Sequence, residues 1–210
     1  MAIPFFKELR IGGYMMKQRL LGRKRYPLVL MLEPLFRCNL ACAGCGKIDY
    51  PDEILNQRLS VQQCMDAIDE CGAPAVSIAG GEPLLHRDMP KIVQGYLERD
   101  KFVILCTNAL LLAKKIDQYK PDPNFTWSIH LDGDKAAHDK SVCLDGTYEK
   151  AVAAIKLAKS KPAFSPLLGV FDARVPREKP MSSSDAIGLL ETQGLVAALH
   201  ATDEMLKVVE

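Results

Sequence analysis

The sequence predicts an α/β fold in which about four consecutive strand–loop–helix units build a parallel sheet. Short apolar runs that are typical of buried strands recur at Tyr26–Leu32, Ala75–Ala79, Phe102–Asn108 and Phe125–Leu131. Each run is followed by a loop and then by residues with helical spacing. Because ligands of such folds bind beyond the carboxyl ends of the strands, we expect the functional site in the loops that follow these runs.

The composition is that of an ordinary globular protein, with 48% hydrophobic and 25% charged residues among 210. A net charge of +1 gives no support for nucleic acid as a partner. No apolar run reaches the ~18 residues of a membrane span. Seven cysteines without a recognisable signal peptide fit a reducing cytoplasm and a metal site better than disulfides. We therefore expect a cytoplasmic protein.

The first segment, residues 1–26, is unlike the rest of the chain because it is strongly basic. Seven Lys and Arg residues accompany one acidic residue, Glu8, which leaves a net charge of +6. Apolar and aromatic residues alternate with these charges. We favour a helix that packs across the bottom of a barrel and keeps its basic face in solvent. The alternative is peripheral contact with the anionic inner face of a membrane.

Three cysteines, Cys38, Cys42 and Cys45, follow the first predicted strand in a C-x3-C-x2-C pattern. Thiolates bind soft metals, and this tight spacing lets one loop wrap a single iron–sulfur cluster. A structural zinc site, which is the alternative, needs a fourth ligand. The other cysteines are scattered singly, at Cys64, Cys71, Cys106 and Cys143. A [4Fe–4S] cluster on three cysteines keeps one iron open for a small molecule.

The next predicted helix begins at a capping box, in which Ser60 and Gln63 satisfy each other's backbone N–H groups. Helical spacing after Ser60 places Cys64 and Cys71 on the buried face. Small apolar side chains are common in cores, so we interpret both thiols as core residues rather than ligands.

A Gly80-Gly81-Glu82-Pro83 turn follows the second predicted strand. Two glycines let the backbone approach a ligand closely, and the Glu82 carboxylate can accept hydrogen bonds from an ammonium group. An ordinary turn is the alternative. Asp88 is then expected to cap the following helix.

The fourth predicted strand carries polar residues on one face, at Ser128, His130 and Asp132, and apolar residues on the other. Buried polar groups need hydrogen-bond partners. Because helices cover the outer face of a β/α sheet, we expect these three to face the site rather than outer solvent. Thr147 is expected to cap the last clear helix.

The C-x3-C-x2-C loop followed by Gly-Gly-Glu-Pro resembles the radical S-adenosylmethionine (SAM) superfamily. The resemblance implies a partial TIM-like (β/α) barrel, a [4Fe–4S] cluster on the three cysteines, and SAM whose methionine amino group is held at Gly80–Pro83. It implies cleavage of SAM to methionine and a 5'-deoxyadenosyl radical, with an electron donor such as flavodoxin or ferredoxin. The remaining cofactor-binding candidates are Thr107, Asn108, Ser128, His130 and Asp132.

Residues 1 to about 159 resemble more narrowly the adenosyl-hopene transferases of bacterial hopanoid biosynthesis. The resemblance implies addition of the radical to the terminal alkene of a hopene-type triterpene. It rests on Ala2–Glu8, Arg37–Lys47, Ser77–Leu84, Leu105–Ala109 and Trp127–Asp139.

The resemblance stops after Lys159, so we divide the chain into the basic segment 1–26, a radical SAM core over 27–159, and a divergent tail over 160–210. No further strand–loop–helix unit is expected in the tail, and the open edge of the fourth strand would lower stability unless the tail or a partner covers it. Two alternatives follow: another radical SAM maturase, or a truncated, non-catalytic fragment that binds an iron–sulfur cluster.

The implied chemistry leaves a carbon radical that needs one hydrogen atom, and a thiol is the natural donor among side chains. Cys106 is our candidate catalytic residue, because it lies at the carboxyl end of the third predicted strand, where it could act on one face of the radical. Cys143, in a loop past the fourth strand, is the competing thiol. The alternative for Cys106 is a small buried core residue.

Overall fold

The computed structural model describes residues 5–161 and 168–170 of the chain. The chain divides into two compact units, and the second, Val29–Arg174, contains every predicted site residue. Of the first unit the structure describes helix α1 (Phe5–Leu20), which ends in the basic residues Lys17 and Arg19. The Tyr14 hydroxyl donates to the Pro27 carbonyl at 2.8 Å. Neither role considered for this basic segment, core packing or membrane contact, is tested by these contacts.

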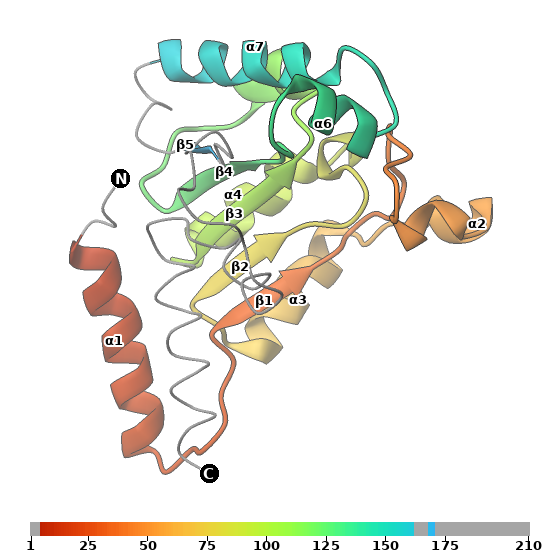
Figure 1. Ribbon diagram of the computed structural model, residues 1–210. Coiled ribbons are helices and arrows are strands. Elements are labelled where there is room, and N and C mark those ends of the chain that lie inside the picture. The colour runs from red at the N-terminus through yellow and green to blue at the C-terminus, as the bar shows by residue number, and fades with distance from the viewer. Residues whose placement is uncertain (1–4, 162–167, 171–210) are drawn as a thin grey trace, which may run out of the picture. The chain divides into compact units, whose positions relative to one another are not determined.

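A parallel sheet forms the centre of the second unit, with its strands in chain order (Figure 1). Each strand pairs in parallel with the next, which confirms the α/β fold with a parallel sheet. Within the described residues the sheet consists of β1 (Val29–Leu32), β2 (Ala75–Ile78), β3 (Phe102–Thr107), β4 (Phe125–Ile129) and β5 (Leu168–Val170).

Strand β5 was not expected, because the sequence shows no strand after Lys159. It pairs with β4, with Leu168 opposite Trp127 and Val170 opposite Ile129. A segment of the predicted tail therefore covers the edge of β4 along this pairing, which is one of the two conditions given for avoiding an open edge. Three residues are too few to show an alternating pattern, so only the tertiary pairing reveals the strand. Most of the predicted tail lies outside the described residues.

Four helices of the second unit, over residues 61–71, 89–98, 112–115 and 147–160, share one hydrophobic core with one face of the sheet. Trp127 on β4 is fully buried, and its ring lies 4.9 Å from that of Phe125 and 4.8 Å from that of Tyr119. Burying such side chains contributes about 1.5–3 kcal/mol each. The helices are α2 (Asp52–Leu55), α3 (Val61–Cys71), α4 (Met89–Glu98), α5 (Leu112–Lys115), α6 (Lys135–Ser141) and α7 (Thr147–Ser160).

The beginning of α3 is as predicted. The Ser60 hydroxyl accepts from the Gln63 backbone N–H at 3.2 Å, and the Gln63 side chain accepts from the Ser60 N–H at 2.8 Å. Cys64 is fully buried and Cys71 half-buried, which agrees with their interpretation as core residues.

Of two other capping predictions, the one for Asp88 is right in position but not in side-chain contact, and the one for Thr147 is wrong. The Asp88 side chain does not cap α4; its carboxylate instead forms ion pairs with Arg87 at 3.1 Å and Lys91 at 2.9 Å. Thr147 is the first residue of α7 rather than its cap, and its hydroxyl donates to the Leu144 carbonyl. In both cases the side chain contacts a nearby partner that the sequence pattern of a helix start does not reveal.

Candidate functional site

A pocket of about 560 Å³ opens where β1, β2, β3 and β4 end, and the cysteine loop and the Gly-Gly-Glu-Pro turn both line it. The structure therefore brings together residues from four loops that are far apart in the sequence. Glu82 and Ser128 do not line it. The predicted residues that do are Cys38, Cys42, Cys45, Gly80, Gly81, Pro83, Cys106, Thr107, Asn108, His130 and Asp132.

The three loop cysteines are half-buried free thiols on one side of this pocket. The Cys45 N–H donates to the Cys42 carbonyl at 3.2 Å, which folds the loop back on itself. Burial raises the pKa of the Cys38 and Cys42 thiols, and a hydrogen bond from the Leu40 backbone opposes this at Cys38. Since metal ligation requires thiolates, a bound cation would offset that cost. Three thiols on one loop beside an open pocket fit a three-cysteine [4Fe–4S] cluster.

The two glycines of the turn pack against the backbone that leads into the cysteine loop. The Gly81 N–H donates to the Leu35 carbonyl at 3.0 Å. Gly80 has a φ of +115°, and a Cβ there would lie 2.5 Å from the Leu35 carbonyl oxygen. A Cβ on Gly81 would lie 2.2 Å from the Phe36 and 2.3 Å from the Arg37 carbonyl oxygen. The glycines are thus required by contact between two protein loops, whereas the sequence suggested approach to a ligand.

The Glu82 carboxylate is fully buried and accepts three hydrogen bonds from the protein. The donors are the Leu84 N–H at 3.0 Å, the Thr107 hydroxyl at 2.8 Å and the Asn108 N–H at 2.9 Å. Burial raises the pKa of Glu82, while these donors oppose the rise. The carboxylate braces the turn against the end of β3. This geometry does not support the predicted contact of Glu82 with an ammonium group.

Cys106 lies on β3 opposite Ser128 of β4, and both side chains are half-buried. The Cys106 thiol lies 3.9 Å from the Ser77 hydroxyl of β2. Burial raises the pKa of this thiol, and hydrogen bonds with Ser77 and Ser128 oppose the rise. The protonated thiol is therefore the favoured form, which is the form that carries an S–H bond.

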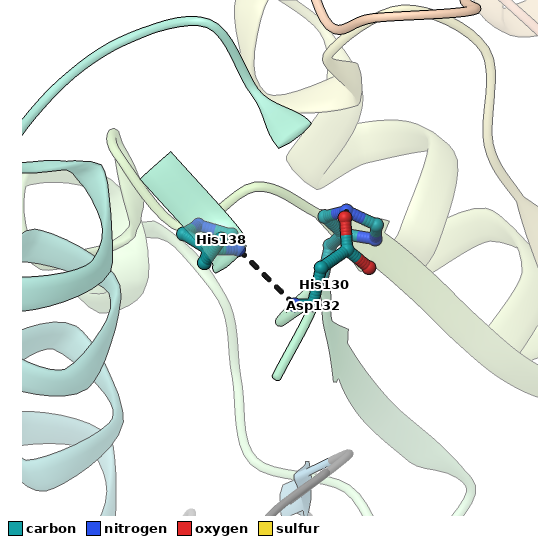
Figure 2. Close-up of side chains that lie close together, drawn as sticks. All are labelled: His130, Asp132 and His138. Carbon is teal, nitrogen blue, oxygen red and sulfur yellow. Dashed lines mark hydrogen bonds and ion pairs between the residues drawn. The ribbon is translucent and has the colours of Figure 1, made fainter. Parts of the chain in front are cut away.

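A side-chain network follows β4. The His130 ring lies 2.8 Å from the Asp132 carboxylate, which also accepts from the Ser141 hydroxyl at 2.5 Å. His138, fully buried on α6, accepts the Asp132 backbone N–H at Nδ1 (Figure 2). Burial raises the pKa of Asp132, but Ser141 and His130 outweigh it and hold the pKa below its usual value.

Ligand atoms of His130, Asp132 and His138 lie within 4.8 Å of one another, close enough to hold a metal ion. His138 is nevertheless a poor ligand here. Since Nδ1 accepts a hydrogen bond, the neutral ring carries its proton on Nε2, and neither nitrogen offers a free lone pair. His130, Asp132 and His138 therefore form a hydrogen-bonded network. Sequence reasoning missed His138 and Ser141 because their contact with Asp132 depends on how α6 folds back.

Comparison with known proteins adds two relatives at low identity. The chain is 31% identical over 140 residues to the GTP 3',8-cyclase of Listeria monocytogenes, which covers 64% of this chain and 42% of that protein. It is 26% identical over 120 residues to the Fe-coproporphyrin III synthase of Methanosarcina barkeri, which covers 55% and 30%. The chain thus spans less than half the length of these relatives.

The fold is also that of a solved structure, SuiB of Streptococcus suis bound to S-adenosylmethionine. The TM-score is 0.55 at 20% identity, over 79% of this chain and 37% of that chain. A sequence profile described as the radical SAM superfamily matches residues 32–165, which is more than half of the chain. The chain therefore belongs to the radical SAM superfamily, whose cofactors are a [4Fe–4S] cluster and SAM.

Proposed function

We propose that this chain forms the cluster- and methionine-binding part of an enzyme that joins the 5'-deoxyadenosyl group of SAM to a hopene-type triterpene. One observation carries the SAM chemistry: a single pocket is lined by Cys38, Cys42 and Cys45 and by Gly80, Gly81 and Pro83. The triterpene is supported by the resemblance to adenosyl-hopene transferases, which extends through Trp127–Asp139.

In this proposal, the residues that line the pocket have different roles. Cys38, Cys42 and Cys45 would hold the cluster, and Gly80, Gly81 and Pro83, which line the same pocket, would face the methionine part of SAM. When bound, cluster and SAM supply a 5'-deoxyadenosyl radical after one electron arrives from a flavodoxin or ferredoxin. His130 and Asp132, both lining the pocket, offer polar groups to the rest of the cofactor.

Cys106 is proposed as the hydrogen-atom donor. Addition forms a bond between the 5' carbon and the terminal alkene carbon, breaks the π bond and leaves a carbon radical. The Cys106 S–H then gives one hydrogen atom to that carbon. The resulting thiyl radical takes one electron and one proton, with the electron supplied by the same reductant. A half-buried thiol that lines the pocket supports this role.

The test is anaerobic reconstitution with iron and sulfide, followed by SAM, reductant and a hopene-type triterpene with a terminal alkene. The expected result is an adenosylated, reduced triterpene detected by mass spectrometry, absent in Cys38→Ala. SAM cleavage that yields only free 5'-deoxyadenosine would rule out the triterpene but keep the radical chemistry. A loaded cluster that cleaves no SAM would indicate the non-catalytic fragment.

A second candidate is a radical SAM maturase with a different substrate. The relatives favour it, because their names refer to GTP and to coproporphyrin rather than to a triterpene. The assay separates the two: this candidate predicts SAM cleavage that is unchanged when the triterpene is omitted.

Peripheral membrane contact through residues 1–26 belongs to the same proposal, because a triterpene substrate resides in a bilayer. Exposed apolar side chains support it: Met16 is 65% and Leu20 83% exposed beside the basic end of α1. Within the described part of the chain, no helix is long and apolar enough to cross a membrane. Each basic residue near an anionic surface contributes about 1 kcal/mol.

Co-sedimentation with vesicles that contain anionic lipid tests this contact. Binding should fall with added salt and on replacing Arg23, Lys24 and Arg25 with Glu. Replacing three exposed basic residues elsewhere, Lys91, Lys114 and Lys150, gives the matched control. Equal binding by both variants would refute the contact.

A further inference from the structure

Asn108, the residue after β3, has its side-chain amide directed at the cysteine loop. Its Nδ2 donates to the Asn39 Oδ1 at 2.8 Å and lies 3.9 Å from the Cys38 sulfur, within reach of an N–H···S hydrogen bond. The two hydrogens of one NH₂ group can serve both acceptors.

The orientation of this amide is determined by its other contacts. Its Oδ1 accepts from the Leu110 N–H at 3.1 Å, which leaves the NH₂ group to face Asn39 and Cys38. Its backbone N–H donates to the buried Glu82 carboxylate at 2.9 Å. Asn108 is thus held from both sides, and its donor cannot turn away without breaking two hydrogen bonds.

The cysteine loop is asymmetric in this respect. Among the residues that the structure describes, a side-chain N–H donor reaches the sulfur of Cys38, and none reaches the sulfur of Cys42 or Cys45. Hydrogen bonds to cysteine sulfurs help to set the reduction potential of an iron–sulfur cluster. An added electron increases negative charge on the sulfurs, so a donor there stabilises the reduced form more than the oxidised form.

We propose that Asn108 is a positioning residue that donates to the Cys38 sulfur of the bound cluster and raises the reduction potential of that cluster. The proposal rests on the cluster part of the proposed function and not on its substrate. Through its backbone N–H, which donates to Glu82, the same residue connects the Gly-Gly-Glu-Pro turn to Cys38.

The experiment measures the cluster midpoint potential by electron paramagnetic resonance during redox titration of the reconstituted full chain, without SAM. Asn108→Ala removes the donor. Asn108→Asp keeps the shape and the oxygen that accepts from Leu110, but places negative charge beside Cys38. Asn124→Ala, at the amino end of β4, is the control.

Asn108→Ala should lower the midpoint potential by about 59 mV, which is a tenfold fall in the equilibrium constant for one-electron reduction. Asn108→Asp should lower it further, and Asn124→Ala should match the unchanged chain. Unaltered potentials in both loaded Asn108 variants would overturn the proposal. Loss of the cluster in both variants, with circular dichroism showing that both are folded, would also overturn the proposal. Asn108 would then only hold the cysteine loop in place. An unchanged chain that binds no cluster would instead refute the proposed function.

Discussion

The two walls of the pocket are built differently. The first, the backbone wall, consists of Leu35–Cys45 and Gly80–Pro83, where two loops meet without room for a Cβ on either glycine. The second, the side-chain wall, consists of His130, Asp132 and Ser141, which hold one another through side-chain hydrogen bonds. His130 and Asp132 side chains are 51% and 40% exposed.

The difference indicates which wall tolerates change. Contacts between backbones cannot relax when a side chain is added, because a carbonyl oxygen has no rotamer to move to. An exposed network of side chains can rearrange and can exchange protein partners for water. We therefore expect substitutions in the backbone wall to abolish function and those in the side-chain wall to adjust it.

The largest effect is expected at the cysteines. Replacing Cys38, Cys42 or Cys45 with Ala removes a cluster ligand, and both the cluster absorbance and SAM cleavage should be lost. Iron and sulfide content with the visible spectrum gives the measurement. Cys71→Ala, a half-buried thiol of α3, is the control and should load normally. A fully loaded cluster in the triple variant would contradict the assignment.

Gly81→Ala probes the backbone wall without removing a ligand. The new Cβ would overlap the carbonyl oxygens of Phe36 and Arg37, so the segment before Cys38 must shift. Both cluster loading and SAM affinity should fall, the latter measured by titration. Gly46→Ala is a matched control beside Cys45, because nothing lies within 4 Å of its Cβ position. Full cluster loading with unchanged SAM affinity would show that the two loops accommodate the added Cβ.

Glu82→Gln tests the brace between the turn and β3. The amide replaces one acceptor oxygen with a donor and leaves a buried N–H partner unpaired, which costs about 1–3 kcal/mol of unfolding free energy. Urea denaturation of the cluster-free chain measures this. Glu98→Gln, at the end of α4, should have little effect. Equal stability of both variants would mean that the buried carboxylate makes no net contribution to the free energy of unfolding.

Cys106→Ala should separate formation of the radical from the later hydrogen-atom transfer, because Cys106 lines the pocket but belongs to neither wall. SAM cleavage should persist, while the reduced adduct falls several-fold or loses its stereochemical purity. Chromatography with mass spectrometry of the products gives the readout. Cys143→Ala, an exposed loop thiol, is the control. If the yield and configuration of the product are the same in both variants, the hydrogen atom comes from elsewhere.

Asp132→Asn should have the smallest effect, because its network is half-exposed. The folded pKa of Asp132 lies below its unfolded value, so its stabilisation is present above the unfolded pKa and is lost as pH falls through the folded pKa. Asp132→Asn lacks this stabilisation, so its Tm should fall less on acidification. Because Asp132 is half-exposed, the stabilisation is worth under about 1 kcal/mol. Asp145→Asn is the exposed control. Identical Tm–pH curves for the variant and the unchanged chain would argue against the network.

Motifs confined to one stretch of backbone could be predicted from the sequence. The C-x3-C-x2-C loop, the capping box at Ser60 and the short apolar strands depend on neighbours a few residues away. Parallel order and right-handed crossovers then place the loops after β1 to β4 at one edge. This is why most predicted site residues line a single pocket.

Roles that depend on a distant partner were decided only by the tertiary structure. Glycine at position 81 looks the same in a sequence whether a ligand or the Arg37 carbonyl lies against it. Glu82 meets its donors 25 and 26 residues away. Strand β5 exists through its pairing with β4, and His138 reaches Asp132 only because α6 turns back. Local patterns specify which residues can do chemistry, but burial and partners depend on contacts that chain order does not encode.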